Sequence, residues 1–92
     1  MSEGPPAREV KVVNKLGLHA RAAARFVRLA ERFEAEVRVA KDDLEVAGTS
    51  ILGLMMLTAT TGSTLRLSAT GPQAAAALEA LVELVARGFD EE

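Results

Sequence analysis

Residues 9–33 read EVKVVNKLGLHARAAARFVRLAERF, and this stretch decides the fold. Glu9 to Val13 alternates polar and apolar side chains, which is the two-residue period of a half-buried strand. Asn14, Lys15 and Gly17 then break the pattern. Ala20 to Phe33 carries apolar residues at the three-and-four spacing of an amphipathic helix. A strand followed by a helix is therefore predicted here.

The rest of the chain continues this alternation of strands and helices. A hairpin of two strands is predicted at Ala35–Val39 and Leu44–Ala47. A short helix is predicted at Ile51–Leu57, a strand at Thr64–Thr70 and a last helix at Pro72–Arg87. Pro72 suits the first position of the last helix and Gly88 its C-terminal cap. The apolar run 51–57 also fits a buried strand by periodicity alone. Each strand has one apolar face, so the fold class is α+β, with three helices covering one side of the sheet.

The composition fits one globular domain. Hydrophobic residues make up 49% of the 92 residues and charged residues 26%, and this length is enough for one core. We expect a flexible N-terminus over 1–7 and a single domain over 8–92. The first eight residues lack the basic and apolar segments of a signal peptide, and no apolar run approaches the roughly 20 residues that cross a bilayer. A cytoplasmic protein without a membrane contact is expected.

Charge and residue types exclude several other classes. The formal net charge of -2 gives no overall field for binding nucleic acid. The chain has no cysteine and one histidine, which excludes disulfides and thiol chemistry and argues against a zinc site. No metal or other cofactor is expected.

His19 is the candidate for chemistry, because it stands at the start of the first predicted helix. The first N–H groups of a helix lack intrahelical partners and the helix dipole is positive there, so an anion is stabilised. An imidazole titrates near neutrality, and a large fraction is therefore the uncharged nucleophile. Position and chemistry together indicate a phosphoryl acceptor.

Arg21, Arg25, Arg28 and Arg32 form one stripe along the exposed side of the same helix. We expect only Arg21 to lie close enough to His19 to act on it, and the other three to be solvated. Nucleic-acid binding along the stripe is disfavoured, because the only aromatic residues are three phenylalanines and two of them are assigned to the core.

Ser50 is suited to cap the short helix that follows it. If Leu54 and Leu57 face inward, then Ile51, Leu52 and Met55 form an exposed apolar patch of the kind that marks a docking site. Core filling by the whole segment is the alternative.

Two motifs resemble one known family. LGLHARAA, residues 16–23, resembles the active-site signature of HPr, the phosphocarrier of the bacterial phosphoenolpyruvate-dependent sugar phosphotransferase system, and GTSILGLMML, residues 48–57, resembles its second signature. The resemblance covers about residues 8 to 89. It implies an open-faced two-layer sandwich, β-α-β-β-α-β-α, with a four-stranded antiparallel sheet. Two positions depart from the family: Ala22 replaces a usual proline, and Thr49 replaces a common lysine.

The resemblance also implies the roles of individual residues. His19 matches the histidine that enzyme I phosphorylates at Nδ1 for transfer to EIIA domains, and Arg21 matches the arginine that steadies the phosphoryl group. Ser50 matches the serine that HPr kinase/phosphorylase modifies in many bacteria. Ile51, Leu52 and Met55 match the docking patch of a monomeric carrier.

Two other functions stay open at this point. One is a regulatory HPr-like protein that does not serve sugar transport. The other is a ferredoxin-like module that binds a small ligand or RNA, in which His19 has no role.

Overall fold

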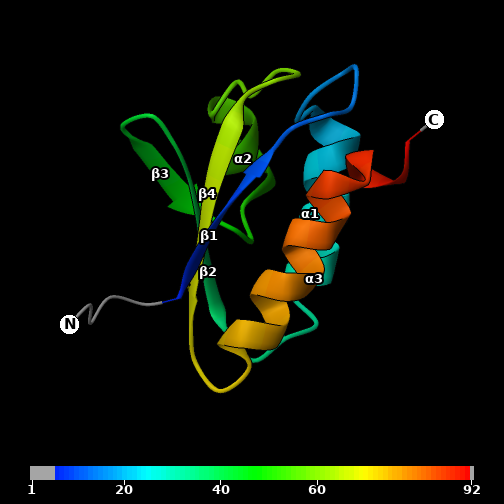
Figure 1. Cartoon of the computed structure of the whole chain (residues 1–92). Helices are drawn as coiled ribbons and strands as arrows, with labels where there is room; N and C mark the ends of the chain where they lie inside the picture. Colours follow the sequence, from blue (N-terminus) through cyan, green and yellow to red (C-terminus); the bar gives the residue numbers. More distant parts are fainter. Residues whose placement is uncertain (1–5, 92) are drawn as a thin grey trace.

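The computed structural model describes residues 6–91, and Figure 1 traces the chain through them. The elements, in order, are β1 (Ala7–Lys11), α1 (Ala20–Ala30), β2 (Glu36–Lys41), β3 (Leu44–Ala47), α2 (Ile51–Met56), β4 (Thr64–Thr70), α3 (Ala74–Ala86) and a 3-10 turn (Gly88–Asp90). The predicted β-α-β-β-α-β-α order is confirmed. Residues 1–5 of the predicted flexible N-terminus lie outside the described residues, whereas Ala7 already pairs with Ser68 in the sheet.

The strands form one antiparallel sheet in the order β1-β4-β2-β3. Its helix-facing side carries the alternate apolar residues that the two-residue period predicts. In the two central strands these are Val37, Val39, Leu65, Leu67 and Ala69, all buried. The opposite side of the sheet carries polar residues and is left open.

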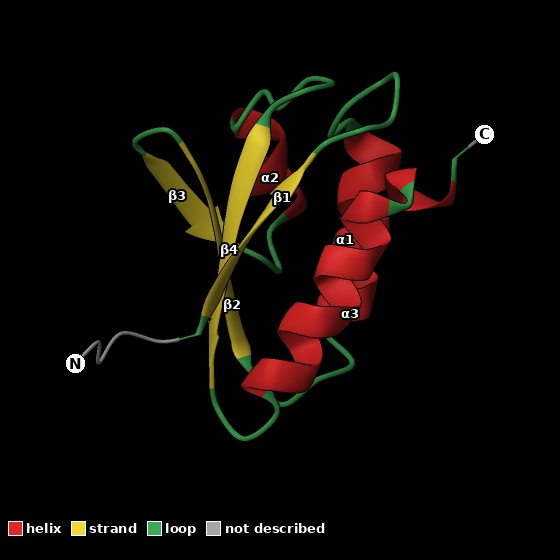
Figure 2. Ribbon diagram, in the orientation of Figure 1, coloured by secondary structure: helices red, strands yellow, loops and turns green. Residues whose placement is uncertain are grey.

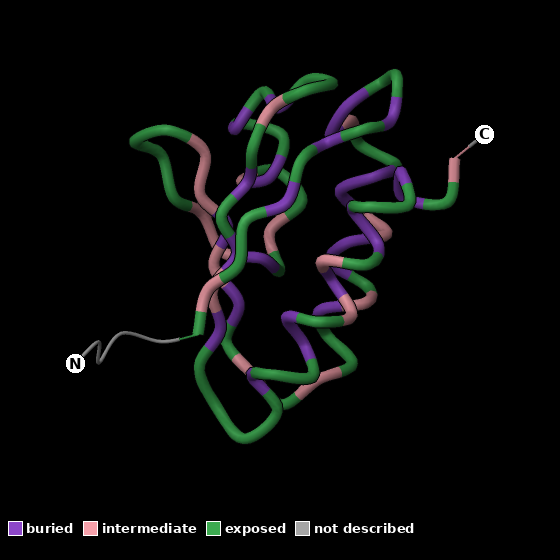
Figure 3. The backbone as a smooth tube through the Cα atoms, viewed as in Figure 1, coloured by how far each residue is buried: buried purple, intermediate pink, exposed green. Residues whose placement is uncertain are grey.

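All three helices cover the same face of the sheet, as Figure 2 shows. α1 packs beside α3, and α2 packs against α1 and β3. The buried segments in Figure 3 line the space between the helix layer and the sheet. Phe26 of α1, Leu54 of α2 and Phe89 after α3 are almost fully buried there. The predicted open-faced, two-layer α+β sandwich is confirmed.

Several element boundaries differ from the predictions. β1 runs over Ala7–Lys11, not Glu9–Val13, because its first residues pair with β4. β2 runs over Glu36–Lys41, not Ala35–Val39, because its last residues pair with β3. The short helix and the last helix each end one residue earlier than predicted.

α1 ends at Ala30, because the chain turns there, and Phe33 still packs against the core from the turn. α3 begins at Ala74, not at Pro72, because Gln73 is held outside the helix. Its backbone N–H donates to Glu34 O (3.0 Å), and its side-chain Oε1 accepts from Glu34 N (2.6 Å).

Candidate phosphoryl acceptor site

His19 occupies the N-cap position of α1 with an extended backbone (φ -80°, ψ 179°). Its backbone carbonyl accepts the first helical hydrogen bond, from Ala23 N (2.8 Å), and its ring makes no capping bond. The imidazole is 26% exposed. The ring is therefore available for chemistry beside the unpaired N–H groups of the first helical turn, where negative charge is stabilised.

The loop before His19 is fixed by close backbone packing. Gly17 adopts φ +68°, and a Cβ there would lie 2.4 Å from Ala59 O, so no other residue fits. Leu18 N donates to the same carbonyl (2.9 Å), and the Leu18 side chain is buried. These contacts deliver His19 to one defined position at the start of α1.

Glu91 closes the site from the far end of the chain. One carboxylate oxygen, Oε2, contacts Nε2 of His19, and the other, Oε1, accepts from Asn14 Nδ2 (2.9 Å). The Asn14 hydrogen bond, followed by that of His19, lowers the pKa of Glu91 below its ordinary value. An ionised Glu91 can only accept, so Nε2 carries a proton and the neutral ring keeps its lone pair on Nδ1.

Asn14 ties the loop and the C-terminal segment together. It is buried, and its Nδ2 also donates to Gly17 O (2.8 Å). Its Oδ1 is buried with no hydrogen-bond partner among the described residues. The sequence interpretation treated Asn14 only as a strand breaker and missed this role.

A hollow of about 470 Å³ surrounds the ring. It is lined by Lys15, Leu16, His19, Arg21, Arg25, Asp90 and Glu91. The guanidinium of Arg21 is exposed and makes no hydrogen bond or ion pair with residues 6–91, so its fork of donors is open to an anion. The structure brings the two predicted residues, His19 and Arg21, into one hollow.

The expectation that Arg21 alone of the stripe approaches His19 is wrong. Arg25 lines the same hollow, and its Nη1 donates to Phe89 O (2.6 Å). The 3-10 turn after α3 folds back over α1 and supplies this acceptor. The helical spacing of the arginines alone could not predict that the Phe89 carbonyl lies beside Arg25.

The first helical turn does not depend on a proline. α1 begins at Ala20, and Ala22 is fully buried against the core. Alanine has the highest intrinsic helix propensity, so the departure from the family pattern leaves the helix start intact.

The apolar segment after Ser50 forms α2, which packs against α1 (Figure 1). Ser50 is the N-cap, and its Oγ accepts from Gly53 N (2.9 Å). Leu54 and Leu57 are buried, which confirms their inward orientation. The exposed residues are Ile51, Leu52, Met55 and Met56, at 41%, 71%, 39% and 66%. The alternative in which the whole segment fills the core is wrong, and Met56, which the prediction omitted, belongs to the patch.

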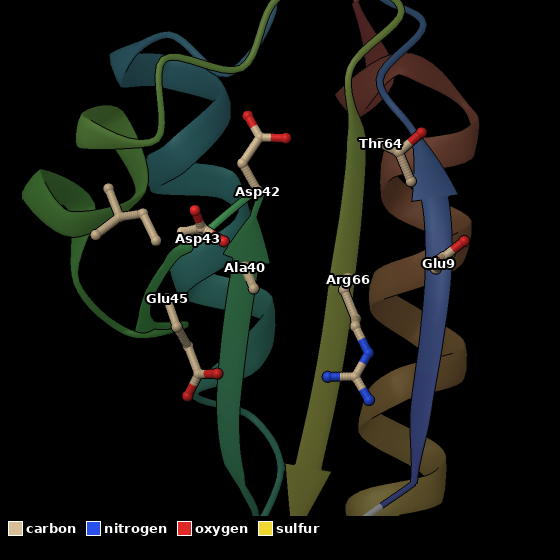
Figure 4. Close-up of a pocket in the computed structure, with 8 residues that line it drawn as sticks. Glu9, Ala40, Asp42, Asp43, Glu45, Thr64 and Arg66 are labelled. Carbon is tan, nitrogen blue, oxygen red and sulfur yellow. The ribbon is translucent and has the colours of Figure 1, made fainter.

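A second hollow, of about 400 Å³, lies on the open face of the sheet, and Figure 4 shows its lining. Ala40 leaves a gap in the cross-strand row between Arg66 and Glu45. The lining is dominated by carboxylates from Glu9, Asp42, Asp43 and Glu45. These acidic groups repel phosphate and include no imidazole, so this hollow does not compete with His19 as a phosphoryl site.

No group of three or more metal-ligating side chains comes together within residues 6–91. Over the same range, every helix is too short or too polar to cross a membrane.

Comparison with known proteins agrees with this geometry. The family model described as "PTS HPr component phosphorylation site" matches residues 6–87. The phosphocarrier protein HPr of Pseudomonas putida is 51% identical over 87 residues, covering 94% of this chain and 97% of that protein. The phosphocarrier protein NPr of Escherichia coli strain K12 is 40% identical over 84 residues, covering 90% and 93%.

Solved structures give the same result. The crystal structure of HPr-C-His from Thermoanaerobacter tengcongensis superimposes with a TM-score of 0.89 at 40% identity, covering 95% of this chain and 98% of that one. An HPr dimer from the same organism superimposes with a TM-score of 0.75 at 40% identity, covering 99% and 100%.

Proposed function

Because this chain belongs to the HPr phosphocarrier family, we propose that it accepts a phosphoryl group from enzyme I at Nδ1 of His19 and passes it to an EIIA domain. The observation that carries the proposal is the contact between Glu91 and Nε2 of His19. It leaves Nδ1 as the nitrogen with a free lone pair, beside the N-terminus of α1.

The transfer step is a displacement at phosphorus. The lone pair of Nδ1 attacks the phosphoryl group of the phosphorylated donor, the new N–P bond forms, and the leaving atom of the donor keeps the electron pair of the broken bond. The ring of His19 gains positive charge as the bond forms. The Nε2 proton stays on the ring, and the Glu91 carboxylate beside it balances that charge.

Arg21 supplies the donors for the phosphoryl oxygens. Its guanidinium is exposed and unpaired within the described residues, and it lines the His19 hollow. A planar fork of N–H groups matches two phosphoryl oxygens. The N–H groups of the first turn of α1 add a second set of donors, so the phosphoryl group is held while the partner approaches.

The partners dock on the apolar patch formed by Ile51, Leu52, Met55 and Met56. These side chains are exposed on α2, which packs against α1. Exposed Met and Leu side chains provide apolar area that adapts to different surfaces. A carrier that meets both enzyme I and an EIIA domain needs such a surface, since the two partners use it in turn.

Ser50 is the candidate for regulation by HPr kinase/phosphorylase. Its Oγ accepts a hydrogen bond as the cap of α2, and a phosphate at the same position would lie directly beside the docking patch. The alternative is a purely structural cap. Thr49 stands before it in place of the family's common lysine, which favours the structural role.

A regulatory carrier outside sugar transport is the second candidate function. The 40% identity to the Escherichia coli phosphocarrier protein NPr supports this second function, as the 51% identity to the Pseudomonas putida HPr supports the first.

The ferredoxin-like ligand or RNA module loses its basis, since the family match covers residues 6–87. A monomeric carrier stays a prediction, and sedimentation would test it against the dimer seen for the Thermoanaerobacter protein.

The test uses the full chain with phosphoenolpyruvate, magnesium and an enzyme I. We expect one acid-labile phosphate per chain by mass spectrometry, at Nδ1 of His19 by phosphorus NMR. His19→Ala is expected to remain unlabelled, and Arg21→Ala to label much more slowly while keeping its melting temperature.

The matched control is Arg66→Ala on the open face of the sheet. Normal labelling of His19→Ala would contradict the proposal, and equal rates for Arg21→Ala and Arg66→Ala would remove the role of Arg21. Phosphate transfer to a sugar-specific EIIA, or its absence, separates sugar transport from regulation.

A further inference from the structure

A groove between α1 and α3 gathers positive charge outside the His19 hollow. Leu29 of α1 and Leu84 of α3 supply its apolar lining, and its volume is about 440 Å³, within the range of small-molecule sites. The charged lining consists of Arg25, Arg28, Arg32, Arg87 and Asp90. We call this feature the arginine groove. It holds four guanidinium groups and one carboxylate in a chain whose net charge is -2.

Two of the four guanidinium groups, those of Arg28 and Arg32, have no counterion among the described residues. Asp90 accepts a hydrogen bond from Nε of Arg87 (2.6 Å). Arg25 donates to the carbonyl of Phe89, and its charge also helps to lower the pKa of Glu91. The guanidinium groups of Arg28 and Arg32 make no hydrogen bond or ion pair within residues 6–91. Like charges on facing walls repel, so an anion in the groove is stabilised.

The geometry favours a phosphate over a simple spherical anion. A guanidinium presents parallel N–H donors that match two phosphate oxygens, and here such forks come from both α1 and the end of α3. Leu29, which is partly buried, leaves apolar surface next to these donors for the organic part of a ligand, whereas Leu84 is only 3% exposed. A small organic phosphate uses both features, whereas a simple inorganic anion uses only the charge.

The arginine groove is connected to the phosphoryl acceptor site through residues 88–91. Arg25 and Asp90 line both hollows. Asp90 bonds Arg87 in the arginine groove, and the next residue, Glu91, contacts His19. Phe89 and Asp90 both have left-handed backbones (φ 58° and 64°). This conformation is unfavourable for the bulky Phe89 and needs the surrounding contacts to hold it, whereas aspartate tolerates it better.

We propose that the arginine groove binds a small organic phosphate, and that the ligand competes with Asp90 for Arg87 and thereby loosens the contact of Glu91 with His19. The phosphate takes the place of the Asp90 carboxylate as the anion on Arg87. Without that bond, the left-handed turn at 89–90 loses one of its two side-chain anchors. Only the coupling to His19 depends on the proposed function, since binding itself needs no phosphoryl transfer.

The test is an NMR titration of the isotope-labelled full chain at constant ionic strength. The probes are inorganic phosphate and glucose 6-phosphate, with sodium chloride as the ionic control. We expect saturable shifts in residues 25–32 and 84–90, and tighter binding of glucose 6-phosphate than of inorganic phosphate. The double variant Arg28→Gln/Arg32→Gln is expected to bind about tenfold more weakly, because a charged hydrogen bond contributes about that factor. The matched control Arg66→Gln, on the open face of the sheet, is expected to bind as the unmodified chain does.

The ring nitrogens of His19 report the coupling. We expect their signals to move with the same saturation curve, and Asp90→Asn to bind glucose 6-phosphate more tightly because the internal competitor is gone. If sodium chloride reproduces the shifts, or if the double variant binds with unchanged affinity, the arginine groove is not the binding site. Shifts centred on Lys15 and Arg21 would place the anion in the His19 hollow instead. A saturated groove with unmoved His19 signals would overturn the coupling. None of these readouts uses enzyme I, so the outcome is independent of the phosphorylation test.

Discussion

Glu91 contacts Nε2 of His19 although the two residues stand 72 positions apart in the chain. Asn14, which is buried, holds the second carboxylate oxygen of Glu91 at 2.9 Å. The C-terminal segment is therefore part of the His19 site. It fixes both the orientation of the imidazole and the nitrogen that carries the proton.

Replacing Glu91 with glutamine tests whether its carboxylate determines which ring nitrogen of His19 carries the proton. We expect Glu91→Gln to lose the preference of the neutral ring for a proton on Nε2, because an amide can donate as well as accept. The phosphorylation rate is expected to fall by about tenfold, on the scale of one charged hydrogen bond at the reacting group. Nitrogen chemical shifts of the ring and initial rates with enzyme I measure the two effects. Glu83→Gln, an exposed change on α3, is the control, and equal rates in the two variants would contradict the role of Glu91.

The lowered pKa of Glu91 predicts how stability depends on pH. Its folded-state pKa lies below the ordinary value of 4.5, so the ionised form favours the folded state. This contribution is present above pH 4.5 and is lost as the pH falls through the lower folded-state pKa. The melting temperature of the unmodified chain should exceed that of Glu91→Gln at neutral pH, and the difference should shrink towards pH 3. A difference that is constant over this range would show that the carboxylate's charge contributes nothing.

Substitutions at an exposed and a buried position of α2 should affect docking and folding differently. Met55 is 39% exposed, whereas Leu54 beside it is fully buried. Met55→Glu is expected to raise the KM for enzyme I by about tenfold or more, as for a buried residue of an interface, with little change in melting temperature. Leu54→Ala should instead cost about 2–5 kcal/mol of folding stability. Thermal melts and transfer kinetics of both variants measure this, and a large loss of stability in Met55→Glu would place Met55 in the core.

Ser50 caps α2, and an aspartate at this position could still accept the capping hydrogen bond. Ser50→Ala removes the acceptor of the Gly53 N–H bond, so we expect a loss of about 1 kcal/mol and a melting temperature lower by roughly 4 to 8 °C. Ser50→Asp retains an acceptor at the N-cap and should keep its melting temperature. Its affinity for enzyme I should fall, because docking must then desolvate a charge beside Ile51 and Leu52. Unfolding of Ser50→Asp, or a wild-type rate at every enzyme I concentration, would reduce Ser50 to a plain cap.

The local periods of the sequence determined the secondary structure and its burial. Leu44–Ala47 and Thr64–Thr70 form strands within the predicted limits, because a two-residue period sets which side chains face the helices. Leu54 and Leu57 are buried as their helical spacing predicts. His19 lies at the start of α1, because the loop glycine and the alanine-rich run define where that helix begins.

The tertiary structure alone decided what surrounds His19. Asn14, Arg25 and Glu91 meet there from the loop, the middle of α1 and the C-terminal end. No local period relates these three positions, since their approach depends on α3 running back along α1 and on the left-handed turn at Phe89 and Asp90. Pro72 likewise lost its predicted helical position because Gln73 pairs with Glu34 across the fold. Periodicity in a sequence encodes which face of an element is buried, whereas a contact between distant residues exists only once the packed layers have fixed the ends of those elements in space.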